Sequence, residues 1–116
     1  MNSDEETIRQ AYEAFNARDI DAVLAVLSPE VMWANGMEGG YVQGHTALRD
    51  YWTRQWQTIN PHVEPLSLTR DASGQVRVVV HQVVRDMAGT ILADQNFVHT
   101  YLIDKRLVQR MHIVQE

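Results

Sequence analysis

Three polar side chains attract attention because two strand-like segments would bring them together. Residues 76–85 (VRVVVHQVVR) and 92–103 (LADQNFVHTYLI) are joined by a short turn and read as a β-hairpin. Counting outward from a two-residue turn, His81 faces Asn96 and lies diagonal to Asp94. Histidine titrates near neutral pH and suits general acid–base catalysis, and a neighbouring carboxylate can orient its imidazole. We therefore predict His81 and Asp94 as catalytic residues, with Asn96 as a ligand-binding neighbour.

The hairpin has two faces of different character, because strand side chains alternate between faces. The face with His81 mixes polar and apolar residues, whereas the other is apolar apart from Gln82, Gln95 and His99. The pattern allows two arrangements. Either the valine-rich face is the core and His81 meets solvent, or helices cover the His81 face and a second subunit covers the other. A slip of one residue would exchange the faces of one strand.

Four aromatic residues and one asparagine complete the predicted site. The aromatic residues can form an apolar wall of the kind that lines most small-molecule sites, and they are Tyr12, Trp33, Trp52 and Trp56. Asn35 ends a predicted strand, where its amide can bind a ligand oxygen. The structural alternative is that the tryptophans belong to the core and that Asn35 caps the turn into a glycine-rich loop.

The elements that must position these residues follow a simple order. Apolar periodicity predicts helices over 4–18, 19–27 and 46–59 and strands over 31–35, 62–70, 76–85, 92–103 and 107–114. Ser28-Pro29 is expected to end the second helix, and the glycines between 36 and 44 predict a loop. Helices first and strands last is typical of an α+β fold, with helices on one face of a mostly antiparallel sheet.

Composition excludes several functional classes. The chain has 116 residues, 45% hydrophobic and 22% charged, which suits one globular domain over 1–116. Its 10 basic and 15 acidic residues give a net charge of −5, so we expect no nucleic-acid partner. There is no cysteine, no histidine spacing typical of a metal site and no phosphate-loop motif, so we expect no metal and no cofactor. The acidic start MNSDEE is no secretory signal, and no apolar run is long enough for a membrane span, so we expect a cytoplasmic protein.

Three segments of the sequence are distinctive: AYEAFNARDIDAVLAVL (11–27), VMWANGMEGG (31–40) and GHTALRDYW (44–52). They resemble segments of NTF2-like proteins of the SnoaL and ketosteroid-isomerase type. The resemblance implies a cone-shaped α+β fold, in which three N-terminal helices pack on a curved, mostly antiparallel sheet and enclose a pocket. It also implies a homodimer through the outer face of the sheet, and it implies that the face with His81 is the inner one. The dimer surface would then consist of Val76, Val78, Val80, Val84, Phe97 and Tyr101.

The catalytic positions of ketosteroid isomerase carry over poorly. Its chemistry uses a carboxylate base, a tyrosine and a protonated carboxylic acid. By resemblance, the base falls on Asn35, the acid on Val98 and the tyrosine on Ala11, one residue from Tyr12. Asn35 and Val98 are therefore expected only as ligand-binding positions.

Two functions remain open from the sequence. The first is a general acid–base enzyme of the isomerase, dehydratase, cyclase or hydrolase type, acting through His81 and Asp94 on a mostly apolar, oxygenated molecule. The second is a non-catalytic module of the same fold that binds a small apolar molecule or dimerises.

Overall fold

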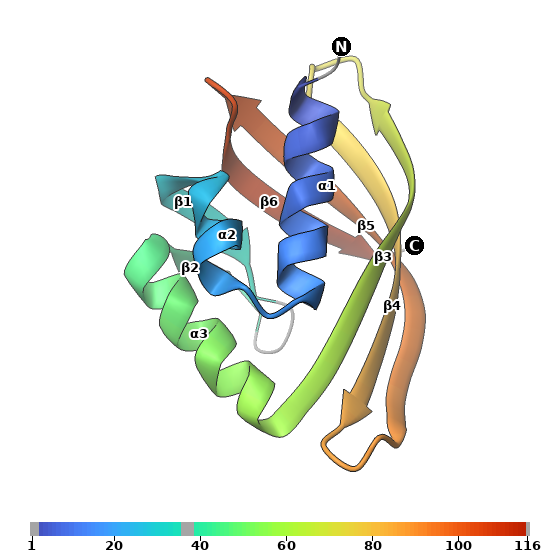
Figure 1. Cartoon of the computed structure of the whole chain (residues 1–116). Coiled ribbons are helices and arrows are strands. Elements are labelled where there is room, and N and C mark those ends of the chain that lie inside the picture. The colour runs from blue at the N-terminus through green and yellow to red at the C-terminus, as the bar shows by residue number, and fades with distance from the viewer. Residues whose placement is uncertain (1–2, 36–38, 116) are drawn as a thin grey trace.

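The computed structural model describes residues 3–35 and 39–115, and within them the chain forms three helices and one six-stranded sheet. Figure 1 shows the three helices on one side of the sheet, so the predicted α+β class is confirmed. The elements are α1 (Ser3–Asn16), α2 (Ile20–Ala25), β1 (Leu27–Ala34), β2 (Tyr41–Gln43), α3 (His45–Thr58), β3 (Ile59–Arg70), β4 (Val76–Asp86), β5 (Ile91–Asp104) and β6 (Leu107–Gln115). None of the described helices is long and apolar enough to cross a membrane.

The sheet has the strand order β2-β1-β6-β5-β4-β3 and is mostly antiparallel, as predicted, with one parallel pair, β1 and β6. Strand β1 begins at Leu27 and includes Pro29. The sequence predicts Ser28-Pro29 only as the end of the second helix, which in the structure ends earlier, at Ala25. The ladder of β1 with β6 is interrupted between Leu27 and Met32, so Pro29, which has no backbone N–H, lies where no ladder bond is needed. The predicted loop also contains strand β2; residues 36–38 of that loop lie outside the described part.

The β4–β5 hairpin has the predicted register but a different turn. His81 pairs with Asn96, as counted from the sequence. The turn has three residues rather than two, because the Asp86 carboxylate accepts the backbone N–H groups of Ala88 and Thr90, and Gly89 adopts a φ of 95°. One extra residue in β5 opposite the Val84–Arg85 step restores the register.

The helices cover the valine-rich face, not the His81 face. Val76, Val78, Val80 and Tyr101 are at most 2% exposed and pack in one core cluster with residues of all three helices. The predicted dimer surface is therefore wrong: its six residues, Val76, Val78, Val80, Val84, Phe97 and Tyr101, face the interior. Burying a valine side chain gains about 1.5–3 kcal/mol, whereas enclosing the polar side chains of the His81 face would require a partner for each.

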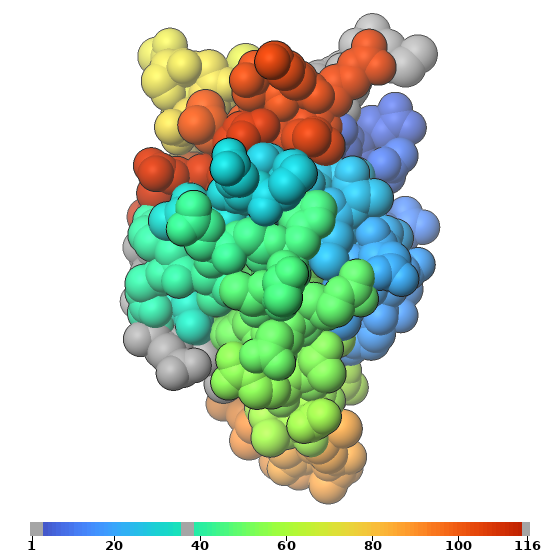
Figure 2. All heavy atoms as spheres, turned by 90° about the vertical axis from the view of Figure 1, so that its left-hand side faces the viewer, coloured from blue at the N-terminus to red at the C-terminus, as the bar shows by residue number. Residues whose placement is uncertain are grey.

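The junction of α1 and α2 fastens the helices to the edge strand β3. The Asn16 amide donates to the Val63 carbonyl oxygen (2.7 Å) and accepts the Val63 N–H (3.0 Å). Arg18, two residues after the end of α1, has a positive φ of 64°, and the Asp19 carboxylate caps α2 by accepting the Ala22 N–H at 3.1 Å. Figure 2, seen from the α3 side, shows α3 beside α1 and α2 over the sheet, with the β4–β5 turn (orange) projecting beyond them.

Candidate functional site

A cavity of about 400 Å³ lies between the helices and the inner face of the sheet. Its polar lining residues are Tyr12, Tyr51, Gln55, Gln82, Gln95, His99 and Tyr101. The larger apolar ones are Phe15, Trp33, Trp52, Ile59, Leu92, Phe97, Met111 and Ile113. No Asp, Glu, Lys or Arg belongs to the lining among the described residues, so the cavity suits an uncharged and mostly apolar molecule.

A buried chain of hydrogen bonds crosses one end of the cavity. The Tyr101 hydroxyl donates to the Tyr12 oxygen (2.7 Å), and the Tyr12 hydroxyl lies 2.8 Å from Nδ1 of His99. Tyr12 lies one helical turn after Ile8 on the buried stripe of α1, and His99 and Tyr101 alternate onto the inner face of β5. The Tyr12 and His99 rings stack at 5.9 Å between centroids, so packing and hydrogen bonding hold the same arrangement.

Burial keeps this chain uncharged. It lowers the pKa of His99 from 6.5 to about 4, because the charged imidazolium would lose its hydration. It raises the pKa of both Tyr12 and Tyr101, because a buried phenolate is likewise disfavoured. At neutral pH the group can therefore donate and accept hydrogen bonds, but it carries no charge.

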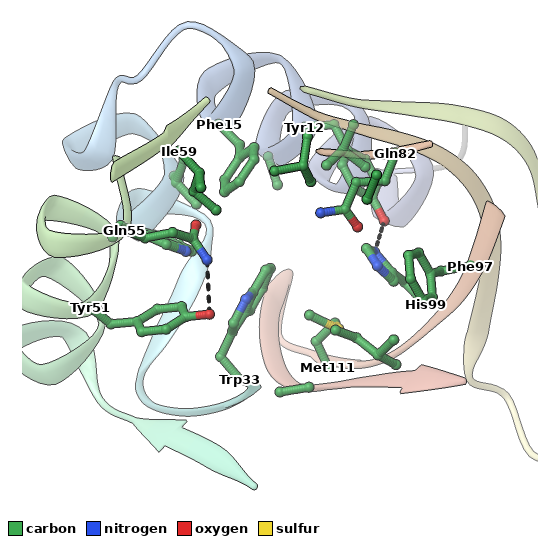
Figure 3. Close-up of a pocket in the computed structure, with 18 of the residues that line it drawn as sticks. Tyr12, Phe15, Trp33, Tyr51, Gln55, Ile59, Gln82, Phe97, His99 and Met111 are labelled. Atoms are coloured by element: carbon green, nitrogen blue, oxygen red, sulfur yellow. Dashed lines mark hydrogen bonds between the residues drawn. The ribbon is translucent and has the colours of Figure 1, made fainter. Parts of the chain in front are cut away.

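A second polar group lies at the other end. Gln55 and Tyr51 are one turn apart on α3, and the Gln55 amide donates to the Tyr51 hydroxyl at 3.0 Å. Figure 3 shows this pair on one side of the cavity and Tyr12, Gln82 and His99 on the other, with Phe15, Ile59 and Trp33 around the space between them. The cavity thus has two polar ends and an apolar middle.

Three of the four predicted aromatic residues line the cavity. These are Tyr12, Trp33 and Trp52. Trp56 stacks on Trp52 (6.0 Å, 7°) and lies outside the lining. Its Nε1 is buried and, within the described part of the chain, has no hydrogen-bond partner.

The predicted catalytic pair lies on the opposite face of the sheet. His81 Nε2 is 2.5 Å from Asp94 Oδ1, so the carboxylate does contact the imidazole. The two side chains are 37% and 54% exposed, and neither lines the cavity. Their placement in the pocket is therefore wrong, because the helices pack on the other face of the same hairpin.

The remaining predicted ligand-binding residues also lie outside the cavity. Asn96 shares the outer face with His81 and is exposed. Val98 is buried on that outer face, paired with Val79 and Val114. The backbone of Asn35 is hydrogen-bonded to two glycines: its N–H donates to the Gly40 carbonyl oxygen (2.9 Å), and its carbonyl oxygen accepts the Gly39 N–H (2.9 Å). Their assignment to the pocket is wrong as well.

Sequence reasoning missed the residues that do supply polarity. Gln82, Gln95 and His99 are the three polar interruptions of the valine-rich face, and all three line the cavity. They carried the signal, since a polar residue in an otherwise buried row needs a partner or a ligand. By resemblance the acid position falls on Val98, which neighbours His99 in β5 but lies on the opposite face of the sheet.

Comparison with known families identifies the chain. The model of the SnoaL-like domain matches residues 8–108. The chain is a SnoaL-like protein. No curated protein sequence matches it. Among the described residues of this SnoaL-like protein, no three His, Asp or Glu side chains are grouped so that they could hold a metal ion.

Solved structures share the fold over the whole chain. An NTF2-like protein of unknown function from Burkholderia pseudomallei is 25% identical, with a TM-score of 0.86 over 100% of this chain and 92% of that one. TerC, co-crystallised with polyporic acid, is 24% identical, with a TM-score of 0.86 over 99% and 92%. Rv0760c from Mycobacterium tuberculosis, in complex with estradiol-17beta-hemisuccinate, is 14% identical, with a TM-score of 0.85 over 100% and 95%. At these identities the last two show a common fold and no more.

Proposed function

We propose that this SnoaL-like protein binds an elongated, uncharged and mostly apolar ring molecule that carries an oxygen at each end. The observation that carries the proposal is the placement of two polar groups, Tyr12–His99 and Tyr51–Gln55, at opposite ends of an apolar cavity. A volume of about 400 Å³ lies in the range of small-molecule sites. The ligands in the TerC and Rv0760c structures, polyporic acid and estradiol-17beta-hemisuccinate, support a small molecule as occupant.

Binding, rather than acid–base catalysis, is the function that the site supports best. An efficient general base has a pKa near the working pH, whereas burial lowers the pKa of His99 to about 4. The lining also offers no carboxylate among its described residues. In this proposal the curved sheet and the helices form the cone that the family resemblance implies, and the polar groups orient the ligand within it.

The experiment is equilibrium dialysis with radiolabelled estrone, which carries a ketone at one end and a phenol at the other. Val84 lines the cavity, and its neighbour Val83 points to the outer face of the same strand. Val84→Phe fills the cavity and should weaken estrone binding at least tenfold, or about 1.4 kcal/mol. Val83→Phe adds the same volume outside the cavity and should leave binding unchanged.

Deoxyestrone, which lacks the phenol hydroxyl, tests the second polar end. We expect it to bind more weakly than estrone, because one polar group then stays without a partner. Absence of saturable estrone binding, or equal weakening by the two valine substitutions, would overturn the proposal.

A further inference from the structure

The buried tyrosines determine which nitrogen of His99 carries the proton. Tyr101 is 0% exposed, and within the described residues its hydroxyl has one hydrogen-bond partner, the Tyr12 oxygen. A buried hydroxyl proton without an acceptor costs about 1–3 kcal/mol. The Tyr101 proton therefore points to the Tyr12 oxygen.

The proton of Tyr12 then has one acceptor left. It cannot point to Tyr101, because the Tyr101 proton already lies between the two oxygens. Its other partner among the described residues is Nδ1 of His99, at 2.8 Å. Tyr12 therefore donates to Nδ1, which must be unprotonated. Since a neutral imidazole carries one proton, that proton is on Nε2.

The protonated nitrogen is available to a ligand. His99 lines the cavity and lies at the same end as Tyr12 and Gln82 in Figure 3. Its side chain is 6% exposed, and no described residue accepts a hydrogen bond from Nε2. Within the described residues the buried polar atom that lacks a partner is Trp56 Nε1 and not His99 Nε2, so Nε2 is open to the cavity, where a ligand atom can accept its proton.

We propose that the Nε2–H group of His99 selects a carbonyl oxygen of an uncharged molecule at this end of the cavity. The inference rests on the proposed function and narrows its ligand class. A carboxylate is disfavoured, because no Lys or Arg belongs to the described lining and an unpaired buried anion is costly. A hydroxyl is a poorer match than a carbonyl, because it brings a proton of its own that needs a further acceptor.

The tautomer is testable in the ligand-free protein by ¹⁵N NMR near pH 7, because the protonated and unprotonated ring nitrogens resonate far apart. We expect His99 to carry its proton on Nε2. Tyr12→Phe removes the donor to Nδ1 and should shrink the shift difference between the two nitrogens to half or less. Tyr101→Phe removes a hydroxyl from the same chain but keeps the Tyr12 donor, so it should retain the difference. A proton on Nδ1 in the unmodified protein, or equal loss in both variants, would overturn the inference and leave the proposed function standing.

The ligand class is testable with α-tetralone and α-naphthol, which share a bicyclic skeleton and differ in offering a ketone or a hydroxyl. We expect calorimetry to give α-tetralone an affinity about tenfold higher, as one good hydrogen bond would. His99→Gln keeps a donor at this position and should keep the preference, whereas His99→Leu should bring the ratio close to one. Circular dichroism shows whether each variant is folded. A preference for α-naphthol, a preference unchanged in His99→Leu, or failure of α-tetralone to bind a protein that binds estrone would contradict the inference, whereas failure of estrone itself to bind would contradict the proposed function.

Discussion

The buried imidazole of His99 should make the stability of this protein depend on pH. Its pKa is about 4 in the folded protein and returns to 6.5 on unfolding. Between these values the unfolded chain binds a proton that the folded chain excludes, so stability falls as the pH falls through this window. At about 1.4 kcal/mol per pKa unit, the full loss is about 3 kcal/mol below the lower pKa, and about 2 kcal/mol is already lost near pH 5.

Urea denaturation at about pH 7 and about pH 5 measures this loss. Other groups also titrate in this range, so the test is a difference between variants. His99→Gln removes the titrating group but can still accept the Tyr12 proton, and it should lose about 2 kcal/mol less than the unmodified protein. His62→Gln removes an exposed histidine of β3 and should behave like the unmodified protein. If His99→Gln lost as much stability as the unmodified protein, the buried and neutral state of His99 would be refuted.

Two further predictions concern the core and the outer face. Trp52 is 1% exposed and packs against Trp33 and Trp56, so Trp52→Ala should lower the free energy of unfolding by about 3–5 kcal/mol in a urea titration. The control is Leu66→Ala, because Leu66 is 54% exposed and its loss should change that free energy by less than about 0.5 kcal/mol. The exposed His81–Asp94 pair is worth at most about 1 kcal/mol, so His81→Ala should change stability by no more than that. His81→Ala should also leave estrone binding unchanged. A tenfold weaker affinity would contradict the placement of His81 outside the binding site.

The sequence predicts the local structure well because local signals decide it. Helical periodicity, the proline after α3 and the turn around Gly89 lie within a few residues of what they determine. The pairing of His81 with Asn96 follows from the hairpin alone. The three-residue turn was not predictable by counting, because it depends on the Asp86 side chain accepting two backbone N–H groups.

The choice of the inner face could not be predicted in the same way. It depends on where three amphipathic helices dock, and both faces of the hairpin contain valines; Val98, on the outer face, is itself 1% exposed. Grouping His81 with Asp94 favours the wrong face, because a cluster of polar residues on a sheet need not belong to a pocket. The actual site places isolated polar residues, His99 and Gln82, among apolar ones. Resemblance to a family gave the architecture but assigned the wrong face as the inner one, since an offset of one residue in a strand reverses the face.

The parallel pairing of β1 with β6 has a consequence for how the protein forms during translation. Trp33, on β1, pairs with Met111, on β6, so adjoining parts of the cavity wall come from segments that leave the ribosome far apart in time. Until β4, β5 and β6 have been synthesised, the aromatic side chains of Phe15 and Trp52 lack the sheet against which they pack. Such long-range contacts slow folding and expose apolar surface on the nascent chain. We therefore expect this domain to fold late, once β6 has emerged, rather than element by element as its helices appear.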